Sequence, residues 1–249
     1  ESTVRLEFRR VLLRSTPGGP APYLGEDGRK NAEDAAANVR LNLDYFRCIS
    51  AVDDCVGRLL DALDELGFAT NTVVVFTSDN GFYVGEHGLG DKRSAYDESL
   101  RIPFLVRYPA LGAAARGRVV DEMVLNLDFA PTLLDFAGLS TSREMQGRSW
   151  RPLLGSGSVP WRDDWFYEYF AEKQEGSKVP DITAVRTTDA KLIKYPGHDD
   201  WTEMFDLRAD PHEMRNLFND PAHNALRTRL EAAHARLVHE TGYRVPDFV

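Results

Sequence analysis

A glycine-rich loop carries the side chains with the clearest chemistry in this sequence. Residues 73–93 read VVVFTSDNGFYVGEHGLGDKR, so an apolar run leads to Asp79 and Asn80 and then to Lys92. Carboxylate and amide oxygens are hard ligands that suit Ca²⁺ or Mg²⁺. A lysine in the same loop opposes the negative charge that develops on a sulfuryl or phosphoryl oxygen. The residues favour an anion-processing site, but an ordinary surface turn also fits the sequence Asp-Asn-Gly.

The elements before this loop predict an α/β architecture. The apolar run is continuous rather than alternating, so we expect Thr72 to Phe76 to form an interior strand of a mostly parallel sheet. Ligands of open sheets bind beyond the carboxyl ends of strands, where Asp79 and Asn80 stand. Apolar residues recur every three or four positions between residues 41 and 66, which predicts a helix with one buried face that ends at Gly67.

The two cysteines, Cys48 and Cys55, both fall in this predicted helix. Seven helical residues span about 10.5 Å, whereas a disulfide requires Cα atoms within about 7 Å. We therefore expect two unpaired thiols on the buried side of the helix, rather than a metal-binding or catalytic pair.

A second strand and a helix follow the loop. Residues 102–107 are apolar and strand-like. The helix after them has Asp128 as its expected N-cap, Pro131 in its first turn and Gly138 as its stop. These elements complete a first domain, which we place at residues 1–152.

The remaining sequence, residues 153–249, predicts a smaller α+β subdomain built on an antiparallel sheet. An aromatic strand is expected at 161–170 and a hairpin at 184–195, with its turn near Thr188. A final helix is expected at 222–240, packed against this sheet. Gly, Ser and Pro cluster between the two parts, which is typical of a boundary.

Composition excludes some classes of function. The chain has 249 residues and a net charge of −9, so its surface should repel nucleic acid. No apolar run is long enough to predict a membrane span. The N-terminal residues lack the apolar core of a signal peptide, and the sequence does not begin with Met, so the compartment stays undetermined.

Several collinear segments resemble the sulfatase family, within the alkaline-phosphatase-like superfamily. The most specific is TSDNGFYVGEHGLGDKRSAYDESLRIPFLVRYP. Others, in the same order as in the family, are ISAVDDCVGRLLDALDELG, LDFAPTLLDFAGL and FDLRADPHEMRNLFNDP. The resemblance covers residues 38–221 and implies an α/β, alkaline-phosphatase-like sandwich whose central sheet is flanked by helices, followed by the small C-terminal subdomain.

The resemblance also implies roles for residues of the loop. Asp79 and Asn80 match two ligands of a divalent metal, usually Ca²⁺. Lys92 matches the residue that contacts the sulfate and the leaving oxygen of the substrate, and is the expected catalytic residue. His87 matches a position at the substrate rim, although a surface or locally hydrogen-bonded role also fits its glycine-rich surroundings.

Two departures from the family pattern stand out. Asp97 occupies a position where the family usually has Glu, and we interpret it, with Arg101, as an ion-pairing support of the loop. Sulfatases form their formylglycine nucleophile within a Cys/Ser-x-Pro/Ala-x-Arg motif, and neither Cys48 nor Cys55 lies in such a motif. The paired N-terminal aspartates of the metal site are missing too. We expect the C-terminal part of a sulfatase, with a metal site completed by ligands outside this sequence.

Three functions remain open at this point. The first is hydrolysis of a sulfated sugar or aryl sulfate, with the missing N-terminal half of the same protein as partner and no activity of the isolated chain. The second is hydrolysis of phosphonate or phosphate esters by the same loop chemistry. The third is a non-catalytic binding or assembly role.

Overall fold

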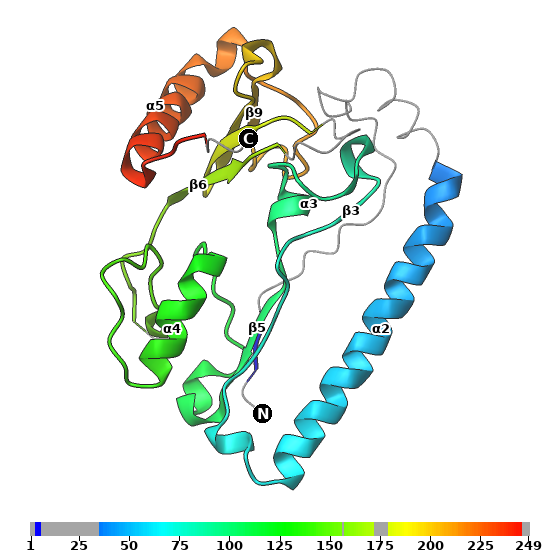
Figure 1. Ribbon diagram of the computed structural model, residues 1–249, viewed down its shortest axis with the longest axis vertical. Helices are drawn as coiled ribbons and strands as arrows, with labels where there is room; N and C mark the ends of the chain where they lie inside the picture. Colours follow the sequence, from blue (N-terminus) through cyan, green and yellow to red (C-terminus); the bar gives the residue numbers. More distant parts are fainter. Residues whose placement is uncertain (1–2, 6–34, 156, 172–178, 246–249) are drawn as a thin grey trace. The chain divides into compact units, whose positions relative to one another are not determined.

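A computed structural model describes residues 3–5, 35–155, 157–171 and 179–245, which group into two compact units (Figure 1). The first unit contains Leu43–Asp79 and Ile102–Arg162. The second contains Asn80–Arg101 and the described residues from Asp163 onward. The glycine-rich loop therefore groups with the C-terminal sheet. The boundary predicted after residue 152 stays a prediction.

The first unit contains a small antiparallel sheet. Its strands are β1 (Thr3–Arg5), β2 (Val74–Thr77) and β5 (Phe104–Arg107), in the order β1-β5-β2. Both strand pairs are antiparallel, with Val75 opposite Val106. The predicted strands are present, but an interior position in a mostly parallel sheet is wrong for β2 within the described residues. A continuous apolar run indicates that both faces of a strand are apolar, and it does not specify the direction of the neighbouring strand.

A long helix, α2 (Ala35–Glu65), precedes this sheet. It ends as predicted, because Gly67 adopts a φ of 73° and the Phe68 amide donates to the Leu63 carbonyl. Seven apolar side chains on or just after the helix are 41–66% exposed: Leu43, Tyr45, Phe46, Ile49, Val52, Leu59 and Leu66.

The prediction that Cys48 and Cys55 lie on a buried side is wrong, because both thiols are exposed. They are free cysteines, as the spacing predicted. Periodicity determines which side chains share a helix face, but burial requires another element against that face. No element among the described residues covers the thiols of α2.

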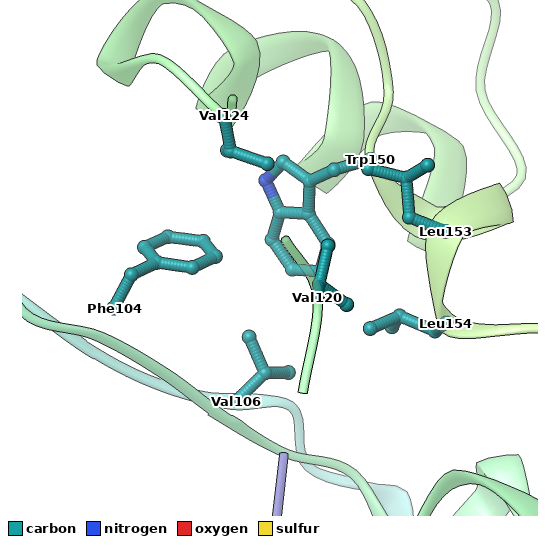
Figure 2. A pocket seen from close by; sticks show the side chains of 7 residues that line it. All are labelled: Phe104, Val106, Val120, Val124, Trp150, Leu153 and Leu154. Atoms are coloured by element: carbon teal, nitrogen blue, oxygen red, sulfur yellow. The ribbon is translucent and has the colours of Figure 1, made fainter. Parts of the chain in front are cut away.

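The hydrophobic core of the first unit gathers around Trp150. The Trp150 ring packs edge-to-face against Phe104 at 5.3 Å and Phe136 at 5.6 Å between ring centroids. Figure 2 shows the small apolar pocket beside it, lined by Phe104, Val106, Val120, Val124, Trp150, Leu153 and Leu154. The phenylalanines come from β5 and from helix α4 (Phe129–Phe136), so this core joins sheet to helix.

Asp128 is the N-cap residue of helix α4, as predicted, but its side chain makes no capping hydrogen bond. Instead the carboxylate accepts hydrogen bonds from the Leu125 and Arg148 amides and pairs with both terminal nitrogens of Arg162. A guanidinium with two parallel donors is a stronger partner than a helix amide, which explains why the carboxylate turns away from the helix. Gly138 ends the helix region with a φ of 70°, as predicted.

The second unit is built on a four-stranded antiparallel sheet, as predicted. Its strands follow each other in sequence: β6 (Asp164–Tyr169), β7 (Ile182–Thr187), β8 (Ala190–Lys194) and β9 (Glu203–Asp206). Helix α5 (Asn224–Thr241) covers one face, where Leu230 and Leu237 pack with Val185 and Leu192. The predicted aromatic strand, hairpin and final helix are confirmed.

The glycine-rich loop, taken from here on as Asn80–Arg101 of the second unit, covers the opposite face of this sheet. It contains β3 (Tyr83–Val84), β4 (Gly90–Asp91) and the one-turn helix α3 (Asp97–Leu100). Tyr83 and Tyr96 share a buried cluster with Ala184 and Ile193. Successive residues of a strand point to opposite faces, so Ala184 faces the loop while its neighbour Val185 faces α5.

Short 3-10 turns connect these elements: η2 (Ala69–Asn71), η3 (Glu86–Gly88), η4 (Pro109–Leu111), η5 (Ala113–Ala115), η6 (Asn126–Asp128), η7 (Arg151–Leu154), η8 (Asp199–Trp201) and η9 (Pro221–His223). Among the described residues, no helix has the length and hydropathy of a membrane span.

Candidate functional site

The backbone of the loop turns sharply at three residues that are not glycine. His87, Asp91 and Arg93 have φ values of 55°, 66° and 82°, which place three non-glycine residues in the left-handed region. Such conformations cost about 1–3 kcal/mol each and persist only where the surrounding structure enforces them. Gly81 is required for a different reason, because a Cβ there would lie 2.0 Å from the Glu98 carbonyl oxygen. The loop is a tightly determined structure and not an ordinary surface turn.

The predicted metal ligands directly follow strand β2. The side chain of Asp79 is exposed, and its Oδ1 lies 3.3 Å from the Ser78 hydroxyl. The side-chain amide nitrogen of Asn80, Nδ2, donates to the Gly81 carbonyl at 2.7 Å. This bond turns the side-chain amide oxygen of Asn80 away from that carbonyl. The Gly81 amide in turn donates to Ser99 at 2.8 Å. This chain of bonds fixes the backbone that carries Asn80.

Asp79 and Asn80 could supply only part of a metal site. They offer one carboxylate and one amide oxygen, whereas Ca²⁺ takes six to eight oxygen ligands. Across the part of the chain that the structure describes, no group of three or more His, Cys, Asp or Glu side chains is arranged to hold a metal. The oxygen chemistry of Asp79 and Asn80 fits a calcium site to which other residues also contribute.

Lys92 is accessible to a substrate. Its side chain is 40% exposed, and its Nζ lies 3.8 Å from Asp91 Oδ1. Arg93 approaches the other oxygen of the same carboxylate at 3.6 Å. Lys92 and Arg93 thus both approach the carboxylate of Asp91 just after strand β4.

His87 lies inside the loop. Its imidazole is buried and stacks in parallel on Tyr96, with 3.9 Å between ring centroids. The Nε2 atom lies 3.3 Å from Glu98 Oε2. The ring is therefore held inside the loop by packing on Tyr96 and by its approach to the Glu98 carboxylate. Its predicted position at the substrate rim stays a prediction.

The interpretation of Asp97 as an ion-pairing support of the loop is confirmed, since it pairs with Lys191 at 2.6 Å and Arg186 at 3.3 Å. The same interpretation is wrong for Arg101, whose exposed side chain forms no ion pair with the described residues. Both partners of Asp97 come from the hairpin of the C-terminal sheet, far along the sequence. Glu213 joins the group, since it accepts a hydrogen bond from the Asp97 amide at 2.6 Å. A lysine flanked by apolar residues in the strand AKLIK was the sequence signal that this group existed.

Two more buried contacts hold the loop. The Tyr96 hydroxyl lies 2.9 Å from each carboxylate oxygen of Glu203, and Tyr195 donates to the same carboxylate at 2.7 Å. Burial raises the pKa of Glu203, against the opposing effect of the tyrosine hydrogen bonds. The Tyr83 hydroxyl bonds to Ser94, which ties the two arms of the loop together.

Comparisons with known proteins agree with the sequence resemblance. The family described as "N-sulphoglucosamine sulphohydrolase, C-terminal" matches residues 85–240, and the family described as "Sulfatase" matches residues 17–139. The two matches together span both the glycine-rich loop and the C-terminal sheet.

Named relatives and solved structures point the same way. An N-acetylglucosamine-6-O-sulfatase of Bacteroides thetaiotaomicron is 43% identical over 178 residues, which are 70% of this chain and 31% of that protein. A structure in complex with its substrate D-glucosamine-2-N,6-O-disulfate is 39% identical, with a TM-score of 0.70, over 77% of this chain and 39% of the other. A phosphonate monoester hydrolase of Agrobacterium radiobacter is 26% identical, with a TM-score of 0.68, over 77% and 40%.

The chain therefore spans about a third to two fifths of the length of the proteins it matches. These likenesses confirm the predicted fold class, an α/β fold of the alkaline-phosphatase-like kind with a small antiparallel sheet of four strands.

Proposed function

The chain belongs to the sulfatase family of sulfuric ester hydrolases, and on that premise we propose that the protein containing it hydrolyses the sulfate ester of a sulfated amino sugar. The observation that supports this most is the continuous sulfatase match over residues 17–139, which includes the whole stretch from Asp79 to Lys92. The relatives named for N-acetylglucosamine 6-sulfate and for a disulfated glucosamine favour a 6-sulfated glucosamine as the substrate. An aryl sulfate would serve as a simpler substrate of the same kind.

Family membership implies a divalent metal, and we assign Asp79 and Asn80 as two of its ligands, with Ca²⁺ as the ion. When bound, the ion would act as a Lewis acid toward a sulfate oxygen. The Asp79 carboxylate supplies negative charge to that site, and the hydrogen bond from Asn80 to Gly81 orients the amide oxygen. The remaining ligands come from residues outside this sequence.

Lys92 is the charge-stabilising residue of this proposal. Its side chain directly follows strand β4 and is 40% exposed, so the ammonium group is open to an incoming anion. In this position it meets a sulfate oxygen and donates a hydrogen bond to the leaving oxygen as the ester bond breaks. Such a donor is worth most when it is held in place before the reaction.

The nucleophile and the rest of the catalytic domain must come from elsewhere in the protein. Neither cysteine of the chain lies in the formylglycine motif, and the one Ser-x-Pro-x-Arg sequence, Ser158 to Arg162, has its arginine paired with the buried Asp128. The exposed apolar side chains of α2, from Leu43 to Leu66, form a surface of the kind that another part of a protein covers. We propose that the missing half of the sulfatase domain packs there, and that the isolated chain does not turn over substrate.

A phosphonate or phosphate ester hydrolase is the second candidate. The structural likeness to a phosphonate monoester hydrolase supports it, at lower sequence identity than the likeness to the glucosamine disulfate complex. The same cation and lysine would serve a phosphoryl oxygen, so the loop chemistry does not separate the two.

The test uses the full-length protein with N-acetylglucosamine 6-sulfate, 4-nitrophenyl sulfate and phenyl phosphonate monoesters. We expect kcat/KM to be highest for the sulfated sugar. Preference for the phosphonate would favour the second candidate, and absence of turnover with all three would favour a non-catalytic role.

Two variants test the assigned residues in the same assay. Asp79→Ala should lose bound calcium and activity together, whereas Asp121→Ala, a change at another exposed aspartate of the first unit, should keep both. Lys92→Ala should lower kcat by roughly 10²–10³, the size typical of removing one charge-stabilising group. Full calcium content and activity in Asp79→Ala would contradict the metal assignment.

A further inference from the structure

Two cations of the C-terminal sheet lie directly opposite each other. Arg186 on β7 pairs in register with Lys191 on β8, on the face that the glycine-rich loop covers. The Lys191 side chain is fully buried. Like charges at opposite positions of an antiparallel pair destabilise it. A buried lysine also pays a large desolvation cost. The arrangement is therefore unfavourable for the sheet by itself.

The loop supplies the charge that makes this arrangement favourable. Asp97 extends one carboxylate oxygen to each cation, with Oδ1 at 2.6 Å from Lys191 Nζ and Oδ2 at 3.3 Å from Arg186 Nη2. Burial alone would raise the pKa of Asp97, but the two cations lower it below its ordinary value. Arg186 and Lys191 thus together bind one carboxylate of the loop, that of Asp97.

Glu213 holds the same residue by its main chain. Its Oε2 accepts from the Asp97 amide at 2.6 Å, while its Oε1 lies 2.6 Å from Lys191 Nζ. Glu213 has a φ of 54°, so its own backbone is held in the left-handed region to make these contacts. Asp97, Arg186, Lys191 and Glu213 form one group, here called the buried ion cluster.

The buried ion cluster lies at the end of the strained part of the loop. Lys92 is five residues before Asp97, and Ser94, Ala95 and Tyr96 between them are buried. Arg93, next to Lys92, is one of the left-handed residues. Strain of this kind has to be offset by contacts nearby. The cluster supplies such contacts at the C-terminal end of the loop. The hydrogen bond between the hydroxyls of Tyr83 and Ser94 supplies another contact within the loop.

We propose that Lys191 is a positioning residue for the reaction: by binding Asp97 together with Arg186 and Glu213, it fixes the loop conformation in which Lys92 meets the sulfate. The inference rests on the proposed role of Lys92. Lys191 itself does not touch the substrate, because it is enclosed between the sheet and the loop.

The kinetic test is a double-mutant cycle in the full-length protein. Lys191→Met removes the charge while keeping most of the side-chain volume, and should lower kcat at least tenfold. In a Lys92→Ala background the same change should lower kcat less than twofold, since no lysine is left to position. Asp189→Asn is the matched control: Asp189 lies in the turn of the same hairpin, the change removes the charge of its ion pair with Arg229 of α5, and kcat should stay within twofold. An equal loss in both backgrounds would overturn the proposal.

Hydrogen–deuterium exchange provides a readout that does not depend on activity. In Lys191→Met, peptides covering residues 82–97 should exchange at least tenfold faster, while peptides of α5 should exchange as in the wild type. Arg186→Met, which removes only one of the two contacts to Asp97, should give a smaller effect in the same peptides and serves if Lys191→Met does not fold. Unchanged exchange in residues 82–97 would overturn the positioning role. A wild-type protein without sulfatase activity would refute the proposed function, and the exchange result would still decide the role of the cluster.

Discussion

His234 should make the stability of the second unit depend on pH. The imidazole lies on α5 against the sheet and is 9% exposed. Its Nε2 is 3.0 Å from the Thr183 hydroxyl, and the Phe166 ring lies edge-on at 5.6 Å. Burial, with a smaller contribution from Lys194, lowers the pKa of His234 from 6.5 to about 4.

The sign and size of the effect follow from this difference. Above about pH 6.5 the imidazole is neutral in both the folded and unfolded states, so it adds no pH dependence. As the pH falls toward about 4, the unfolded chain binds a proton that the folded chain does not, and the free energy of unfolding decreases. A pKa lowered from 6.5 to about 4 corresponds to at most about 3 kcal/mol, and screening by solvent brings the expected loss to about 2 kcal/mol.

Replacing His234 with leucine should remove this contribution. Urea unfolding of the wild type and of His234→Leu, measured between pH 4 and 7.5, gives the free energy of unfolding at each pH. The loss between pH 6.5 and 4 should be about 2 kcal/mol smaller in the variant. His239→Gln changes an exposed histidine of the same helix and should leave the wild-type curve unaltered. Parallel curves for the wild type and His234→Leu would refute the reasoning.

Three further predictions concern activity and stability. The isolated chain, residues 1–249, should show no aryl sulfate hydrolysis even with added Ca²⁺. Adding the rest of the protein with a matured nucleophile should restore hydrolysis. Turnover by the chain alone would reveal another nucleophile. Arg162→Ala leaves the fully buried Asp128 without its ion-pair partner and should lower the free energy of unfolding, measured in urea, by about 3–5 kcal/mol. A loss below about 1 kcal/mol would contradict this account of the ion pair. Trp150→Ala should cost about 3–5 kcal/mol in the same measurement, and a much smaller loss would mean that the core closes over the gap.

Local elements of the fold were predictable from the sequence because their causes are local. Gly67 ends α2 where the helical period ends, and the turn near Thr188 joins two strand-forming segments. The order of strands β6 to β9 also follows the chain, since neighbours in the sequence pair as neighbours in the sheet. Each of these features depends on residues within a few positions of one another.

The sequence by itself determined the chemistry of the candidate site: Asp79 and Asn80 at the end of an apolar strand, and Lys92 in the loop that follows. Only the tertiary structure decided what holds that loop. Lys191 lies 94 positions from Asp97 and Glu213 lies 116 positions from it, and all three meet only because the loop packs on the far face of the C-terminal sheet. A local pattern reports the type and spacing of side chains, whereas the partner of a buried charge is set by which surfaces pack together.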